Sequence, residues 1–93
     1  AVMVNNFTNH MYTLAYEHAA QHELPVEILH AIMRQGPGKA IDLGPKKAQT
    51  GPAVRFDTPT LEKHMDSIKD QDVQTLYKLL SASIQKHHPK DEL

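Results

Sequence analysis

Apolar residues recur at three- and four-residue steps along most of the chain, which is the spacing of one face of an α-helix. In the first part of the chain this face consists of Val4, Phe7, Met11, Leu14 and Ala15. Asparagine favours the residue just before a helix, so Asn5 or Asn6 is expected to cap this element. The pattern predicts a first helix that runs to about His22.

A second helix is expected to begin at Pro25, because proline suits the first helical position. Its apolar face consists of Val26, Leu29, Ile32 and Met33. Gly36-Pro37-Gly38 predicts the end of this helix, since both residue types disfavour a helix interior. A short helical turn over residues 39–43 and then a loop to Asp57 should follow. Loops of this length are often functional.

Two further helices are predicted after the loop. Thr58-Pro59 has the pattern of a cap followed by the first helical residue, and the apolar positions that follow are Leu61, Met65 and Ile68. The last helix should start at Asp70 or Asp72 and end before Pro89, with an apolar face of Val73, Leu76, Tyr77, Leu80 and Ile84. Because no strand-like alternation is present, the sequence predicts a single all-α domain over residues 1–93 with four or five helices.

Composition excludes several classes of protein. The 93 residues include 10 basic and 11 acidic side chains, for a formal net charge of −1. This balance argues against a nucleic-acid or membrane-surface partner, which would demand a basic face. No apolar run approaches the roughly 20 residues of a membrane span. The absence of cysteine excludes disulfides and thiolate chemistry.

Seven histidines raise the question of a metal site. His18 and His22 are four residues apart on a predicted helix, so both rings could reach one ion. The order of a helical metalloprotease motif is not met, because Glu17 precedes this pair instead of following its first member. We therefore expect no native metal site.

A polar cluster marks the start of the first predicted helix. It consists of Asn5, Asn6, Asn9 and His10, of which Asn6 and His10 are one turn apart and share a face. One interpretation is helix capping and solvent exposure. The other is that this end of the helix lines a cleft, where amides and a neutral imidazole orient a polar ligand.

Residues 49–57 are the most informative stretch. Gly51-Pro52 imposes a turn, Thr50 offers a hydroxyl, and Arg55 offers a guanidinium that can bind a carboxylate or phosphate with two parallel hydrogen bonds. Asp57 could pair with Arg55 or cap the next helix. The alternative interpretation is a purely structural loop with an internal ion pair. Gly36-Pro37-Gly38 is not a dinucleotide fingerprint, since a third glycine and a preceding strand are missing.

These motifs resemble those of one bacterial family. The residues that match are Asn5-Asn6-Phe7-Thr8-Asn9-His10, Thr50-Gly51-Pro52 with Arg55 and Asp57, Glu62-Lys63-His64, and Leu76-Tyr77-Lys78-Leu79-Leu80-Ser81. The family is a helical C-terminal domain that follows a Rossmann-like domain in NAD(P)-dependent oxidoreductases. It is similar to the C-terminal domains of pyrroline-5-carboxylate reductase and of 6-phosphogluconate dehydrogenase relatives. The resemblance covers residues 1–85.

The resemblance implies a 6-phosphogluconate dehydrogenase-like helical fold that forms a homodimer and one wall of a substrate cleft. Asn6, His10, Thr50 and Arg55 would face this cleft. NAD(P) would be held by an N-terminal domain outside this chain, so the chain alone would be neither active nor able to bind the cofactor. Because the chain starts without a methionine, we expect it to be the C-terminal part of a longer protein. We expect that protein to be cytoplasmic.

The sequence departs from the family and its wider group at two places. Phe56 occupies the position between Arg55 and Asp57 where the family often has glycine. The hydroxyacid dehydrogenases of the wider group place a catalytic lysine four residues before an asparagine on the first helix. Here Val2 precedes Asn6 and Asn5 precedes Asn9 at that distance, which leaves the proton-transfer role unfilled and favours reduction of an imine or another group.

Two other hypotheses remain open. A free-standing helical interaction module without catalysis would also explain the lack of a complete catalytic set. The final residues, Lys90-Asp91-Glu92-Leu93, spell an endoplasmic-reticulum retrieval signal, which we interpret as coincidental because no signal peptide is recognisable at the start of the chain.

Overall fold

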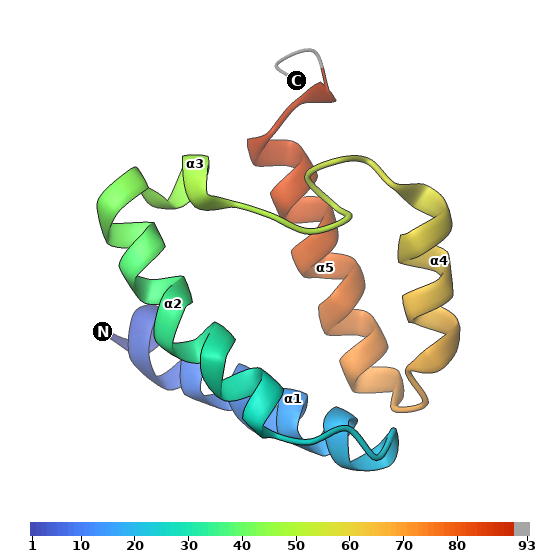
Figure 1. Cartoon of the computed structure of the whole chain (residues 1–93). Coiled ribbons are helices and arrows are strands. Elements are labelled where there is room, and N and C mark those ends of the chain that lie inside the picture. The colour runs from blue at the N-terminus through green and yellow to red at the C-terminus, as the bar shows by residue number, and fades with distance from the viewer. Residues whose placement is uncertain (91–93) are drawn as a thin grey trace. The chain divides into compact units, whose positions relative to one another are not determined.

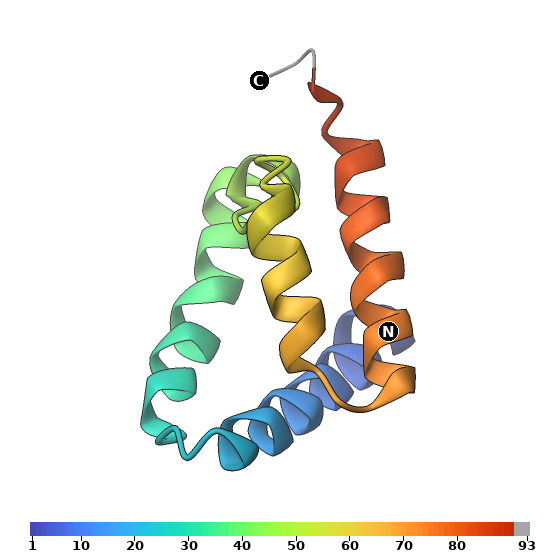
Figure 2. The same cartoon turned by 90° about the vertical axis from the view of Figure 1, so that its right-hand side faces the viewer.

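The computed structural model describes residues 1–90 and consists of helices (Figures 1 and 2). Its elements are η1 (Val2–Phe7), α1 (Thr8–Gln21), α2 (Glu27–Leu43), α3 (Pro45–Ala48), α4 (Thr58–Ser67) and α5 (Gln71–His87). The predicted all-α fold is therefore confirmed. The chain forms two compact units, residues 1–38 and residues 39–93, each of which is described by itself. Asp91, Glu92 and Leu93, and with them most of the retrieval-like signal, lie outside the described residues.

The first helical segment begins earlier than predicted. Its first turn, η1, is a π-helix that leads directly into α1, and it is preceded by Ala1, which makes no side-chain cap. The caps expected at Asn5 or Asn6 are wrong, because both residues lie inside η1. The Thr8 hydroxyl donates to the Met3 carbonyl oxygen at 3.2 Å, which satisfies one acceptor within this wider turn. The end of α1 at Gln21 agrees with the prediction.

The α1 helix ends in a Schellman motif. Leu24 N–H donates to the Ala19 carbonyl oxygen at 2.8 Å, and Glu23 N–H donates to that of Ala20 at 3.2 Å. This arrangement requires a left-handed residue after the cap, and Glu23 adopts it with φ 55°. Glycine is the residue that takes this conformation without steric cost, so Glu23 is strained here.

The α2 helix continues through the segment that was expected to end it. Pro37 lies in the helix interior, and the helix reaches Leu43, so the predicted stop at Gly36-Pro37-Gly38 is wrong. A proline removes one hydrogen bond and disfavours a helical residue before it. Here the preceding residue is Gly36, which has no Cβ to meet the proline ring. The predicted helical turn over residues 39–43 is present as the last part of α2.

The remaining helices start with side-chain caps. Asp57 caps α4, so the expected cap at Thr58 is displaced by one residue, and Asp70 caps α5 by accepting from the N–H groups of Asp72 and Val73. The Gln74 side chain of α5 donates to the carbonyl oxygen of Ile68, at the end of α4, at 2.6 Å. This bond ties the first turn of α5 to the end of α4, and the two helices lie side by side (Figures 1 and 2). The short helix α3 was not predicted.

Most apolar side chains remain exposed. Among the described residues, Ala19 and Ala53 are the buried apolar residues, with 3% and 4% of their surface exposed. Several positions that the pattern assigned to inner faces are exposed instead: Val4, Phe7, Met11, Ile32, Leu76 and Leu80. The apolar faces exist as predicted, but the described chain does not cover them.

The break in the α2 hydrogen-bond ladder leads to a stability prediction. Pro37→Ala should raise the free energy of unfolding by about 1–3 kcal/mol, because alanine restores an N–H donor and removes the ring from the helix interior. Pro45→Ala is the matched control, since Pro45 is at the start of α3, where an N–H has no helical partner. Urea unfolding of the two variants beside the parent chain measures the difference. Equal midpoints for all three would contradict the prediction.

The positive φ of Glu23, just after α1, leads to a second stability prediction. Glu23→Gly should stabilise the chain by about 1 kcal/mol, because glycine adopts a positive φ without the Cβ clash. Glu23→Ala removes the same charge but keeps Cβ, so it should give no such gain. A gain of equal size in both variants would assign the effect to charge and not to the backbone.

Candidate functional site

The loop of residues 49–57 has a defined backbone. Gly51 has φ 102°, a value that favours glycine, and Ala53 is buried beneath the turn. Phe56 N–H donates to the Ala53 carbonyl oxygen at 3.0 Å, and Asp57 N–H donates to that of Pro52 at 2.9 Å. Phe56 also has a positive φ of 53°, although it carries a half-buried aromatic side chain. Positive φ explains why glycine suits this position, and strain of this kind is common at functional sites.

The Asp57 carboxylate connects this loop to α4. It accepts hydrogen bonds from the Thr60 hydroxyl at 2.7 Å and from the Thr60 N–H at 3.3 Å. Arg55 Nη2 lies 3.8 Å from the same carboxylate. Asp57 therefore caps α4 and also pairs with Arg55, so both interpretations made from the sequence apply to it.

The environment of Asp57 favours its charged form. The Thr60 hydroxyl and N–H lower the pKa of Asp57, and the positive charges of Arg55 and His64 add smaller effects in the same direction. Partial removal from water opposes them. The carboxylate thus remains a hydrogen-bond acceptor at neutral pH.

Arg55 is available for a ligand. Its side chain is 60% exposed, and its contact with Asp57 is long for a hydrogen bond. Because Asp57 already accepts two hydrogen bonds from Thr60, the guanidinium keeps donors that face solvent. Thr50 is also exposed on the same loop. The loop therefore presents a cation and a hydroxyl, the groups that a carboxylate or phosphate requires.

A second polar pair joins α4 to α5. His64 Nδ1 lies 2.8 Å from the Tyr77 hydroxyl, and the two rings meet edge to face with centroids 5.9 Å apart. Neither residue was among the site residues predicted from the sequence. The i, i+3 and i+7 spacing of Asp57, Thr60 and His64 was the signal that could have placed His64 on the face of α4 that the loop joins.

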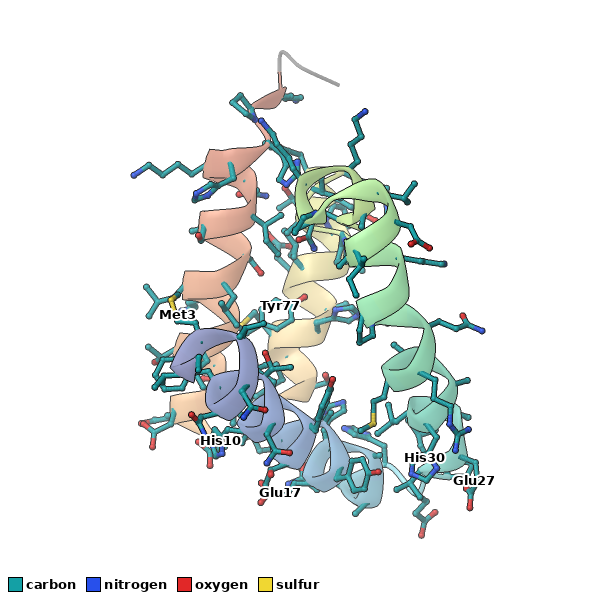
Figure 3. The ribbon with its side chains drawn as sticks, turned by 90° about the vertical axis from the view of Figure 1, so that its left-hand side faces the viewer. Met3, His10, Glu17, Glu27, His30 and Tyr77 are labelled. Atoms are coloured by element: carbon teal, nitrogen blue, oxygen red, sulfur yellow. The ribbon has the colours of Figure 1, made fainter. Side chains whose placement is uncertain are left out.

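A groove of about 500 Å³ lies between α4 and α5. Leu61, Met65 and Ala82 supply apolar lining, and its other lining residues include Glu62, Gln74, Tyr77 and Lys78. Tyr77, labelled in Figure 3, therefore contributes both to the groove and to the pair with His64. Burial raises the pKa of Tyr77, so its hydroxyl stays protonated well above neutral pH.

The polar cluster of the first unit is exposed along one continuous helical stretch. Asn6 lies in η1 and His10 in α1, and both are exposed. Figure 3 shows His10 and Glu17 projecting from α1. The four predicted site residues therefore fall into two groups. Asn6 and His10 lie in the first unit, and Thr50 and Arg55 lie in the second.

A small pocket and a second tyrosine–histidine pair lie elsewhere in the first unit. The Tyr16 hydroxyl is 2.7 Å from His30 Nε2 and links α1 to α2. A pocket of about 220 Å³ is lined by Asn9, Tyr12, Thr13, Tyr16 and Met33. Asn9 is the residue of the predicted polar cluster that lines this pocket.

The histidines do not assemble a larger ligand set in the described part of the chain. The rings of His18 and His22 lie side by side with centroids 4.3 Å apart. Within residues 1–90, no group of three histidine, aspartate or glutamate side chains is placed to hold a metal ion. In the same residues, no helix is both long and apolar enough to cross a membrane.

The fold and the loop define an all-α domain of a known family. Residues 1–84 match the model of a family described as a domain of unknown function, DUF2520, and the chain belongs to that family. None of the curated proteins compared with it gives a significant match.

A solved structure is closely similar. The crystal structure of a "putative NADP oxidoreductase" from Bacteroides fragilis is 41% identical in sequence and superposes with a TM-score of 0.90. The similarity covers 94% of this chain but 34% of the other protein, so the chain spans about a third of the length of the structure that it matches.

The hydrogen bonds of Asp57 predict a pH dependence. Because folding lowers its pKa, the charged carboxylate stabilises the fold above the pKa of about 4 that it has when unfolded, and this contribution is lost as pH falls through the folded value. The melting temperature of the parent chain should therefore exceed that of Asp57→Asn at pH 7, and the difference should shrink towards pH 2.

Thr60→Ala removes the strongest of these hydrogen bonds and should reduce the same pH-dependent difference. Thermal melts of the parent and both variants from pH 7 to pH 2 make the comparison. A difference between parent and Asp57→Asn that stays constant over this range would refute the assignment.

Proposed function

We propose that this chain is the C-terminal helical domain of an NAD(P)-dependent oxidoreductase, where it forms part of the substrate cleft and a dimer contact. The single observation that supports this most is the 41% identity, over 94% of the chain, to one third of the NADP oxidoreductase from Bacteroides fragilis. The remaining two thirds of that protein offer room for a nucleotide-binding domain. The proposal includes similarity to the helical domains of pyrroline-5-carboxylate reductase and 6-phosphogluconate dehydrogenase.

The cofactor is proposed to bind outside this chain. Dinucleotide sites use a glycine-rich loop that follows a strand and places open N–H groups of a helix start against the pyrophosphate. Gly36 and Gly38 lie inside α2, where the helical ladder occupies the backbone groups. This segment does not fit a pyrophosphate, and nothing in the proposed role of this chain depends on its holding the nucleotide.

The exposed residues of the two units are proposed to face the cleft. Asn6 and His10 would contribute an amide and an imidazole, while Thr50 and Arg55 would contribute a hydroxyl and a cation. Exposure of all four supports this role, because groups that meet a substrate or another domain must be reachable. Since no lysine precedes Asn6 at the helical distance that hydroxyacid dehydrogenases use, an imine or another acceptor is favoured over a hydroxyacid.

The exposed apolar faces support a dimer contact. One group of exposed apolar side chains, called here the apolar strip, lies in η1 and the start of α1 and consists of Val2, Met3, Val4, Phe7 and Met11. Contiguous apolar surface of this kind marks interaction sites. The same observation also suits the second candidate, a helical interaction module without catalysis, whose partner would be an unrelated protein.

Nucleotide binding distinguishes the two candidates. The longer protein that contains this chain should bind NADPH and enhance its fluorescence, whereas residues 1–93 alone should not. A coding sequence with a stop codon directly before the first residue would contradict the oxidoreductase proposal. Capture of one unrelated protein partner, together with no NADPH binding by the longer protein, would favour the interaction module.

Sedimentation tests the dimer contact. The longer protein should sediment as a homodimer, and Phe7→Asp should raise the dimer dissociation constant at least tenfold, since Phe7 is 60% exposed in this chain and burial of such a side chain contributes about 1.5–3 kcal/mol. Glu17→Lys, which changes a charge on α1 without touching the apolar strip, is the control. A strict monomer at high concentration would refute the contact.

A further inference from the structure

A pocket of about 400 Å³ lies within the second unit, lined by α3, by the residue that follows α3 and by the end of α5. Its polar lining consists of Lys46, Gln49, Ser83, His87 and His88. Lys46 is positively charged, and each histidine becomes so when it takes up a proton. None of the described lining residues is acidic. The pocket therefore has the electrostatic character of an anion site.

The two segments that line this pocket lack acidic residues over long stretches of sequence. Residues 43–56 contain α3, and residues 73–90 contain most of α5. Neither stretch has an aspartate or a glutamate, and together they hold six basic residues, which are Lys46, Lys47, Arg55, Lys78, Lys86 and Lys90. An anion in the pocket thus meets positive charge, and no carboxylate, from either of these segments.

The ring of His87 is oriented by the backbone of its own helix. Its Nδ1 lies 2.7 Å from the carbonyl oxygen of Ser83. Because a carbonyl oxygen only accepts, Nδ1 carries a proton in both the neutral and the charged ring. Nε2 is then the nitrogen that serves a ligand: it accepts from a protonated ligand oxygen when the ring is neutral, and it donates to an anionic oxygen when the ring is charged.

The carbonyl groups at the end of α5 are already paired. The last carbonyl oxygens of a helix carry partial negative charge, which disfavours an anion beside them. Here the carbonyl oxygen of Ser83 accepts from the His87 ring, and those of Ile84 and Gln85 accept from the His88 N–H at 3.0 and 3.3 Å. These hydrogen bonds occupy the acceptors that would otherwise oppose a negatively charged ligand.

We propose that this pocket binds a phosphate group, either as the free anion or as a small phosphate ester. Lys46 and His88 balance its charge, and His87 bonds one of its oxygens through Nε2. A phosphate monoester carries between one and a half and two negative charges near neutral pH, with three acceptor oxygens. Those oxygens can reach donors on α3 and α5 together, whereas a carboxylate has two oxygens in one plane.

The remaining lining residues suit an ester. Gln49 uses one side-chain N–H to bond the Thr50 carbonyl oxygen at 3.0 Å, which holds the amide and keeps its second N–H for a ligand. Pro45 and Ile84 supply apolar surface for carbon atoms beside the phosphate. None of the residues proposed to face the substrate cleft lines this pocket, so the inference goes beyond the proposed function.

Calorimetric titration of the longer protein with inorganic phosphate, glycerol 3-phosphate and acetate tests the site. Saturating NADP⁺ is present at constant ionic strength, so that a nucleotide site elsewhere in the protein cannot account for the binding. Both phosphates should bind one per chain and at least tenfold more tightly than acetate. The tighter of the two identifies the source of the phosphate group. Equal affinity for acetate, or phosphate binding that NADP⁺ abolishes, would overturn the proposal.

Variants assign the binding to this pocket. Lys46→Gln and His87→Gln should each weaken phosphate binding at least fivefold. The controls Lys47→Gln and Lys86→Gln remove neighbouring charges that do not line the pocket, and they should change the affinity by less than twofold. Melting temperatures show that each variant is folded. Equal losses in the lining and control variants would assign the effect to general electrostatic attraction and refute the site.

Selective ¹⁵N-histidine labelling separates contact with His87 from attraction at a distance. The neutral His87 ring should be the Nδ1–H tautomer, and phosphate should shift its Nε2 resonance, which the His87→Gln spectrum identifies. His64, whose ring is paired with Tyr77, is the internal control and should not shift. An unchanged His87 resonance at saturating phosphate would refute the proposed contact.

Discussion

The hydrogen bonds between Asp57 and Thr60 are the interaction on which the second unit depends. The carboxylate accepts from the Thr60 hydroxyl and N–H, and thereby ends the loop and starts α4 at one residue. The loop can then make its turn at Gly51, and Arg55 is held beside the carboxylate with most of its guanidinium in solvent. One charged cap therefore organises the backbone of the loop and the Arg55 cation together.

A second constraint is the scarcity of core. Five α-helices with apolar faces have two buried alanines among the described residues, while large side chains such as Phe7 and Ile32 stay exposed. Helices in proteins derive most of their stability from the packing of such faces. Polar links between helices, such as Gln74 to Ile68 and Tyr16 to His30, supplement the small core. A domain with so small a core is suited to an assembly in which other parts cover its apolar faces.

The proposed function depends on the family relationship and on the geometry of one loop. The chain belongs to a family described as a domain of unknown function, and a structure with 41% identity over 94% of the chain is that of a protein described as a "putative NADP oxidoreductase", about three times as long. The loop of residues 49–57 combines a strained backbone at Phe56, an exposed Arg55 and a charged Asp57. Backbone strain at Phe56 costs stability, and strain of this kind is common at functional sites, which supports the proposed role of this loop.

The sequence by itself determined the helical periods, the end of α1 near residue 22, the start of α5 at Asp70 or Asp72 and the loop motif. Each of these depends on neighbours a few residues apart. Pro37 was misjudged because its cost in a helix is a tendency that the rest of α2 overcomes. The tertiary structure alone decided which apolar faces stay uncovered and that His64 meets Tyr77, 13 residues further along the chain. Such contacts depend on how two helices pack, and no periodicity within either helix specifies that.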